Sequence, residues 1–185
     1  MIRKQLTLLM VCLIILVPLC AYAGEETLIM YYSKTGKTRI VSEELKELIP
    51  DARLVEIQSN VGIMKAVFWH QLFSLNACNE PISVDLEKYD RIILCSPIWL
   101  QKISSPMRTI INTVPLKGKQ VELFVVCAGH FGEGGQSKLK KQLAAKEITL
   151  QSLCIIKSGG KTDSEIRQQV QEQFGNARQK TNEQR

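Results

Sequence analysis

From residue 27 onward the chain alternates short apolar runs with amphipathic segments, and this alternation restricts its fold more than any other feature. Five runs have the length and composition of strands: Thr27–Tyr32, Ala52–Gln58, Asp90–Ser96, Gln120–Ala128 and Ile148–Ile156. The first is continuously apolar, which is typical of a strand buried on both faces. The sequence therefore predicts an α/β fold, an open parallel sheet of five strands with helices on both faces.

Helix signals separate these runs. Predicted helices lie at Thr38–Ile49, at Ile63–Phe73, from Ser105-Pro106 onward, and at Gln136–Lys146. Ser105 is a favourable N-cap and Pro106 is tolerated in a first turn. The last helix should begin at a capping box formed by Thr162 and Glu165 and should end at Gly175.

Residues 1–23 have the layout of a secretory signal peptide. Arg3 and Lys4 precede the apolar run Leu6–Leu19, and Ala21–Ala23 is a small-x-small cleavage sequence. The apolar run is shorter than the ~20 residues that a membrane span needs, although an uncleaved anchor is the alternative. We expect an exported protein, periplasmic or secreted, with residues 1–23 as signal peptide, 24–175 as one domain, and 176–185 as a polar C-terminal tail.

The charge balance argues against nucleic-acid binding. The net charge is +6 for the whole chain, and it falls to +4 without Arg3 and Lys4. Four lysines of one predicted helix form its solvated face rather than a dense basic tract: Lys138, Lys140, Lys141 and Lys146.

Four cysteines remain beyond the signal peptide: Cys78, Cys95, Cys127 and Cys154. They form no C-x-x-C pair and have no metal-ligand spacing with a histidine. Three lie in apolar runs, where cysteine behaves as a small hydrophobe. One disulfide is compatible with export, but its pairing stays open.

The loop after the first strand has the composition of an anion site. It reads Ser33-Lys34-Thr35-Gly36-Lys37-Thr38 and leads directly into a helix N-terminus. Hydroxyl groups and backbone N–H groups in that position cradle anions, and Gly36 allows a tight turn. The spacing is not that of a Walker A loop. The alternative is a simple capped turn in which Thr35 or Thr38 is the N-cap.

Two further loops follow the third and fourth strands, at the edge of the sheet where open α/β folds bind ligands. The first contains Ser96-Pro97-Ile98-Trp99-Leu100, and its indole can stack on a planar ligand or pack against the sheet rim. The second is the glycine-rich Ala128-Gly129-His130-Phe131, which permits close backbone approach. Phe131 could cover a ligand from a second side, whereas His130 alone is typical of a solvent-facing loop residue and His70 of a structural one.

Taken together, these motifs resemble the flavodoxins across almost all of residues 27–175. Tyr32–Thr38 is similar to the family's phosphate loop, and Tyr89–Trp99 is similar to its third strand and flavin loop; Gly118–Val121 also fits. The resemblance implies a strand order of 2-1-3-4-5 and flavin mononucleotide (FMN) as cofactor. The cofactor-binding residues that it implies are Ser33, Lys34, Thr35, Gly36, Lys37 and Thr38 for the phosphate, Trp99 for stacking with Ser96, Pro97, Ile98 and Leu100 beside it, and Ala128, Gly129, His130 and Phe131 at the flavin border.

The function implied is that of a flavoprotein in which the flavin carries the redox chemistry, without a catalytic side chain or metal. It would be an electron carrier or an FMN-dependent oxidoreductase, with a redox protein or a small acceptor such as a quinone as partner. The alternative is a flavin-free domain of the same fold that acts through partner recognition. Leu100 follows the stacking tryptophan, and a positive φ is unfavourable for leucine.

Overall fold

A computed structural model describes residues 26–59, 73, 75–77, 79–82 and 84–183. The predicted signal peptide, the predicted helix at 63–73 except Phe73, and both His70 and Cys78 lie outside the described residues. The elements are β1 Thr27–Tyr31, α2 Lys37–Leu48, β2 Arg53–Glu56, the 3-10 helix η2 Leu86–Lys88, β3 Arg91–Trp99, β4 Lys102–Ile103, α3 Ser105–Thr113, β5 Gln120–Cys127, α4 Glu133–Ala144, β6 Thr149–Lys157 and α5 Asp163–Glu183.

Five parallel strands form the sheet in the order β2-β1-β3-β5-β6, and the short β4 pairs with β3. This confirms the predicted parallel sheet and its order, with one strand added. The extra strand exists because β3 does not end at Ser96 as predicted but continues to Trp99. The chain then turns back and pairs antiparallel, with Ile98 opposite Ile103 and Trp99 opposite Lys102.

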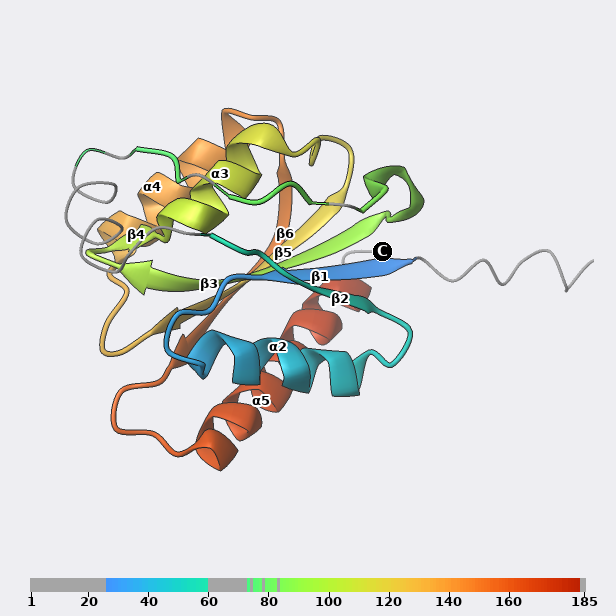
Figure 1. Ribbon diagram of the computed structural model, residues 1–185. Coiled ribbons are helices and arrows are strands. Elements are labelled where there is room, and N and C mark those ends of the chain that lie inside the picture. The colour runs from blue at the N-terminus through green and yellow to red at the C-terminus, as the bar shows by residue number, and fades with distance from the viewer. Residues whose placement is uncertain (1–25, 60–72, 74, 78, 83, 184–185) are drawn as a thin grey trace, which may run out of the picture.

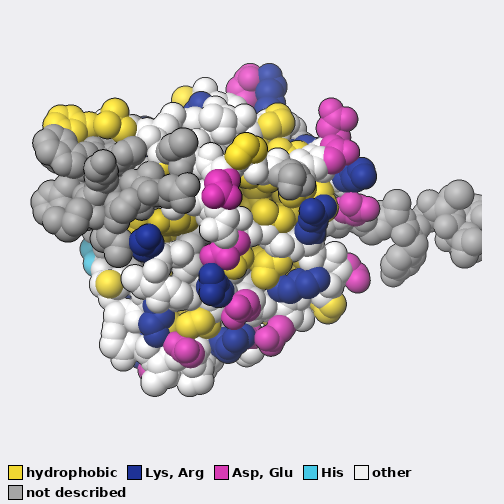
Figure 2. Space-filling model, in the orientation of Figure 1, with side chains coloured by type: hydrophobic (Ala, Val, Ile, Leu, Met, Phe, Trp, Pro, Cys, Tyr) yellow, Lys and Arg dark blue, Asp and Glu magenta, His cyan; other side chains and the backbone are white. Residues whose placement is uncertain are grey.

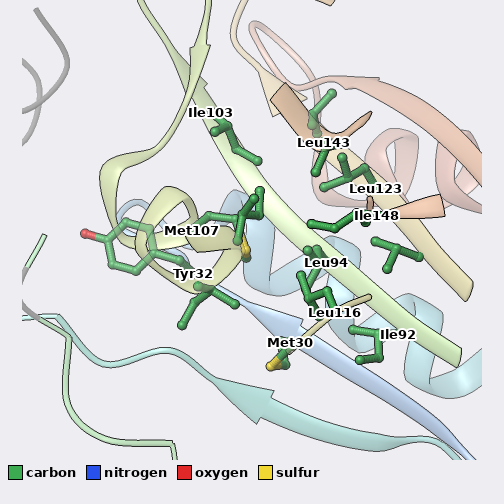
Figure 3. Close-up of a cluster of buried hydrophobic side chains, with 14 of the residues drawn as sticks. Met30, Tyr32, Ile92, Leu94, Ile103, Met107, Leu116, Leu123, Leu143 and Ile148 are labelled. Carbon is green, nitrogen blue, oxygen red and sulfur yellow. The ribbon is translucent and has the colours of Figure 1, made fainter. Parts of the chain in front are cut away.

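Helices cover both faces of the sheet, as predicted: α3 and α4 lie on one side, α2 and α5 on the other (Figure 1). Successive strand residues point to opposite faces, so the core is divided into two clusters. Leu28, Met30, Ile92, Leu94 and Leu123 pack toward α3 and α4, and part of this cluster is drawn in Figure 3. The neighbouring residues Ile29, Ile93 and Phe124 pack with Val41 and Leu45 of α2 and with Ile166 and Val170 of α5.

The start of α5 was predicted correctly and its end was not. The Thr162 backbone N–H donates to Glu165 Oε2 at 2.8 Å, and the Glu165 N–H donates to Thr162 Oγ1 at 3.3 Å, which confirms the capping box. The helix then passes through Gly175 to Glu183, so the prediction that it ends at Gly175 is wrong, and residues 176–183 of the predicted polar tail are helical. A glycine within a helix costs about 1 kcal/mol relative to alanine, but packing of Phe174 and Ala177 against the core favours continuation.

Two other helix boundaries also differ from the prediction. The N-cap of α3 is Ser104 rather than Ser105, and α4 begins at Glu133 rather than Gln136. Among the described residues, no helix is both long and apolar enough to cross a membrane.

Candidate functional site

The carboxyl ends of β1, β3 and β5, the three central strands, lie side by side at one edge of the sheet. After β1 the chain crosses to β2 on one side, whereas β3 and β5 lie on the other. The strand order therefore reverses between β1 and β3, which is where doubly wound sheets bind ligands. The topology brings together the three loops singled out in the sequence.

The loop after β1 ends in a left-handed glycine. Gly36 is the N-cap of α2 with a φ of 85°, a conformation that costs a non-glycine residue roughly 1–2 kcal/mol. The alternative in which Thr35 or Thr38 caps the helix is therefore wrong. Because a glycine cap has no side chain, the first backbone N–H groups of α2 have neither an intrahelical partner nor a capping side chain. This leaves them able to donate to an anion.

Ser33 adds a hydroxyl group to that loop. Its Oγ is buried and has no hydrogen-bond partner among the residues that the structure describes. A buried polar group without a partner costs about 1–3 kcal/mol and is typical of a place where a bound molecule completes the hydrogen bond. Thr35 and Lys34 are exposed beside it, whereas Thr38 is buried.

The amine of Lys37 points toward α5. Its Nζ donates to the Lys161 carbonyl oxygen at 3.3 Å and to Asp163 Oδ1 at 2.9 Å. The side chain that the sequence assigned to phosphate binding thus connects the loop after β1 to the start of α5. Its contribution at the loop is through the backbone.

Trp99 is the last residue of β3 and is only partly buried. Its indole meets the ring of Tyr32 edge to face, with ring centroids 5.9 Å apart and planes at 84°. This is the rim packing that the sequence left as an alternative to stacking on a ligand. Tyr32 itself is buried, its hydroxyl has no partner in the described part of the chain, and burial raises its pKa.

The remaining residues assigned to this loop have two kinds of environment. Ser96 is fully buried and its Oγ lies 2.9 Å from Ser104 Oγ, so its hydroxyl group serves an internal contact between β3 and the start of α3. Pro97 and Ile98 are partly buried residues of β3 itself.

The turn between β3 and β4 has a strained backbone. Leu100 and Gln101 have φ values of 48° and 59°, the positive values at both central positions that a type I′ hairpin requires. Leu100 thus adopts the conformation that its residue type disfavours, with its side chain 60% exposed.

Gln101 is a site residue that the sequence analysis missed. Its Nε2 donates to the His130 carbonyl oxygen at 2.7 Å, and its Oε1 accepts from the Gly132 N–H at 2.7 Å. One amide group therefore joins the β3–β4 turn to the loop after β5. The only sequence signal was its position after Leu100, and that has meaning only once the hairpin is known.

In the loop after β5, Ala128, Gly129 and His130 are exposed, whereas Phe131 is only 2% exposed. The prediction that Phe131 covers a ligand is wrong, because its ring belongs to the core cluster that faces α3 and α4. The backbone of the loop, rather than this ring, is what borders the carboxyl edge of the sheet.

Thiolate chemistry is disfavoured beside this loop. Burial raises the pKa of the Cys95 thiol, which is fully enclosed, and also that of the Cys127 thiol, where Lys157 opposes the effect. Both therefore stay protonated near neutral pH. Within the described ranges, no group of three or more acidic, histidine or cysteine side chains could hold a metal ion.

The architecture is similar to that of solved flavoproteins. The flavoprotein from Lactobacillus acidophilus NCFM in complex with FMN matches with a TM-score of 0.60 and 21% identity, over 71% of this chain and 93% of that one. The apo-form of that flavoprotein gives a TM-score of 0.59 at 21% identity, over 71% and 92%. Oxidised flavodoxin 1 from Bacillus cereus matches with a TM-score of 0.52 and 17% identity, over 82% of this chain and 95% of that one.

Comparison of the sequence shows no relative: no protein-family model matches the chain, and no curated protein matches it either. The likeness to solved structures confirms the expected flavodoxin-like fold.

Proposed function

We propose that the chain binds FMN at the carboxyl edge of its sheet and acts as a redox protein. The observation that supports this most directly is the buried Ser33 hydroxyl, which has no partner among the described residues and lies beside a helix N-terminus capped by Gly36. A phosphate dianion at that position would accept hydrogen bonds from the hydroxyl and from the first N–H groups of α2, and the helix dipole would favour its charge. The FMN complex of the structurally similar Lactobacillus acidophilus protein supports the choice of ligand.

The residues present fit such a ligand in kind and position. Ser33, Thr35 and the backbone of residues 34–38 would hold the phosphate. The Trp99 indole packs against Tyr32, and a flat ring system would stack on the indole face that lies away from Tyr32. The exposed backbone of Ala128–His130 would border the ring. Bound FMN supplies electron transfer, and the protein supplies binding, orientation and shielding from water.

We propose further that the protein exchanges electrons with a redox partner protein or a small acceptor such as a quinone, outside the cytoplasm. The support for export is the signal-peptide layout of residues 1–23. In keeping with either partner, the lower part of the face in Figure 2 carries interspersed positive and negative side chains rather than a field of one sign.

A flavin titration tests this proposal. Purified protein titrated into FMN should quench flavin fluorescence, because a stacked indole quenches an isoalloxazine. Trp99→Ala should weaken binding by about tenfold and remove most of the quenching, since a base–aromatic stack contributes ~1–3 kcal/mol. Trp99→Phe, the matched control, should keep most of the affinity.

A folded protein that binds no FMN would overturn the proposal and would favour the flavin-free binding module. The observations that favour this second candidate are the edge-to-face packing between Trp99 and Tyr32 and the salt bridge between the Lys37 amine and Asp163.

A further inference from the structure

One side chain connects two loops at the carboxyl edge of the sheet. The amide of Gln101 donates to the carbonyl oxygen of His130 and accepts from the N–H of Gly132, both at 2.7 Å. The two bonds lie on either side of Phe131, whose ring is anchored in the core. The loop after β5 is therefore held at three successive residues, two of them by the same amide.

The backbone of Gln101 is strained in the conformation that makes this possible. Its φ is 59° and that of Leu100 is 48°, in a region that non-glycine residues rarely occupy. Both of its hydrogen bonds are exposed to solvent, where water can replace them, so they add little to global stability. The two-residue turn between β3 and β4 requires the positive φ, and that same turn brings the Gln101 side chain to the loop after β5.

Glycines on the other side of the contact accommodate it. A Cβ on Gly135, in the first turn of α4, would lie 2.9 Å from the Gln101 carbonyl oxygen and 2.6 Å from a ring carbon of Phe131. A Cβ on Gly132 would lie 3.5 Å from Gln101 Oε1. The turn, the loop and α4 thus approach so closely that any side chain at position 135 would displace them.

We propose that Gln101 is a positioning residue. Its amide preorganises the backbone of residues 130–132 and holds Trp99, two residues before it, in register with that loop. A planar ligand bound at this edge would then lie between Trp99 and the backbone of residues 130–132, whose spacing is set before the ligand binds. The identity of that ligand as FMN rests on the proposed function, but the positioning of the loop does not.

Two variants of the full chain separate the two hydrogen bonds. Gln101→Met is similar in shape and makes neither bond, whereas Gln101→Glu keeps an acceptor for the Gly132 N–H but loses the donor to His130. Gln168→Met removes an exposed glutamine of α5 that donates to Glu172 and is the matched control.

The first measurement is amide hydrogen exchange of Gly132 in flavin-free protein. Exchange should be about tenfold faster in Gln101→Met, near the native rate in Gln101→Glu, and unchanged in Gln168→Met, as expected for the loss of one net hydrogen bond. An unchanged Gly132 rate in Gln101→Met would overturn the proposal.

The second measurement is FMN affinity together with the midpoint potential of the bound flavin. Gln101→Met should weaken binding about tenfold and shift the potential, Gln101→Glu should lie between it and the native protein, and Gln168→Met should change neither. Tight native binding that Gln101→Met leaves intact overturns the role at the site. If the native chain binds no FMN while Gly132 exchange still responds, the proposed function fails and the positioning role stands.

Discussion

At the scale of single residues, four buried polar atoms lack a partner in the described part of the chain, and two of them lie in the loop after β1. Besides Ser33 Oγ and the Tyr32 hydroxyl, these are Asn79 Oδ1 and Ser105 Oγ. Such groups reduce stability unless something completes their hydrogen bonds. Ser33 and Ser105 make a useful pair, because both are serines whose buried hydroxyl has no partner among the described residues and only Ser33 borders the proposed phosphate site.

Ser33→Ala should therefore separate binding from stability. Loss of the hydroxyl should weaken FMN binding about tenfold to a hundredfold, because one hydrogen bond to a charged group contributes ~1.5–3 kcal/mol. The melting temperature without ligand should stay the same or rise. Ser105→Ala should have the same small effect on melting without weakening FMN binding. Flavin titration and thermal unfolding of both variants measure this, and equal FMN affinities for the two would contradict a role for Ser33.

At the scale of elements, α5 contacts both the loop after β1 and the hydrophobic core. Its first turn receives Lys37 from the loop after β1 through Asp163. Its middle carries Arg167, whose Nη1 lies 2.8 Å from Oε2 of the buried Glu44 of α2. Its last turns cover Phe174, over which Arg178 lies 5.0 Å from the ring centroid. Contacts thus position the helix from Asp163 to Arg178, and those beyond Gly175 favour its continuation past that glycine.

The capping box of α5 should make part of the stability dependent on pH. Glu165 has its pKa lowered from 4.5 to about 2, first by the hydrogen bond from Lys161 and then by the backbone and side chain of Thr162. Because the pKa in the folded state is the lower one, this stabilisation is complete above pH 4.5 and is lost as the pH falls toward 2.

Thermal unfolding of the native chain and of Glu165→Gln between pH 7 and pH 2 tests this. The native chain should melt at the higher temperature above pH 4.5, and the difference should shrink toward zero near pH 2. Glu172→Gln, an exposed change on the same helix, should show no such convergence. A constant difference between the native chain and Glu165→Gln at all pH values would contradict the capping role.

At the scale of the whole molecule, a buried ion pair and the proposed site lie at opposite ends of the sheet. At the amino end of β3, the Arg91 guanidinium pairs with Glu122 of β5 at 2.6 Å, and both side chains are about nine-tenths buried. Trp99 ends the same strand, which places the ion pair roughly 25 Å from the binding edge at ~3.3 Å per residue. Sites this far apart contribute independently.

Glu122→Gln should destabilise the fold without affecting binding. Removing one charge of a buried pair leaves Arg91 without its counter-ion and should cost about 3 kcal/mol in the free energy of unfolding. Urea unfolding measures that loss, and a flavin titration at low urea should give the native affinity. A tenfold change in FMN affinity with an intact fold would show that the two ends of the sheet are coupled.

The sequence determined the order of strands and helices along the chain, the edge of the sheet at which the three loops lie, and the loop from Ser33 to Thr38. These follow from local properties, namely hydrophobic period, capping residues and one glycine with positive φ, which act over a few neighbouring residues. The strand order was predicted from the resemblance of the loop motifs to the flavodoxins, and the order of the sheet confirms it.

The tertiary structure alone decided which side chains face the site. Gln101 binds backbone groups 29 and 31 positions away, and Phe131 turns into the core because α4 begins close beneath it. Trp99 stays within β3 because β4 pairs with it, and Lys37 turns to Asp163 because α5 starts nearby. No local pattern encodes contacts between such distant segments, because each depends on how close the finished sheet brings its loops.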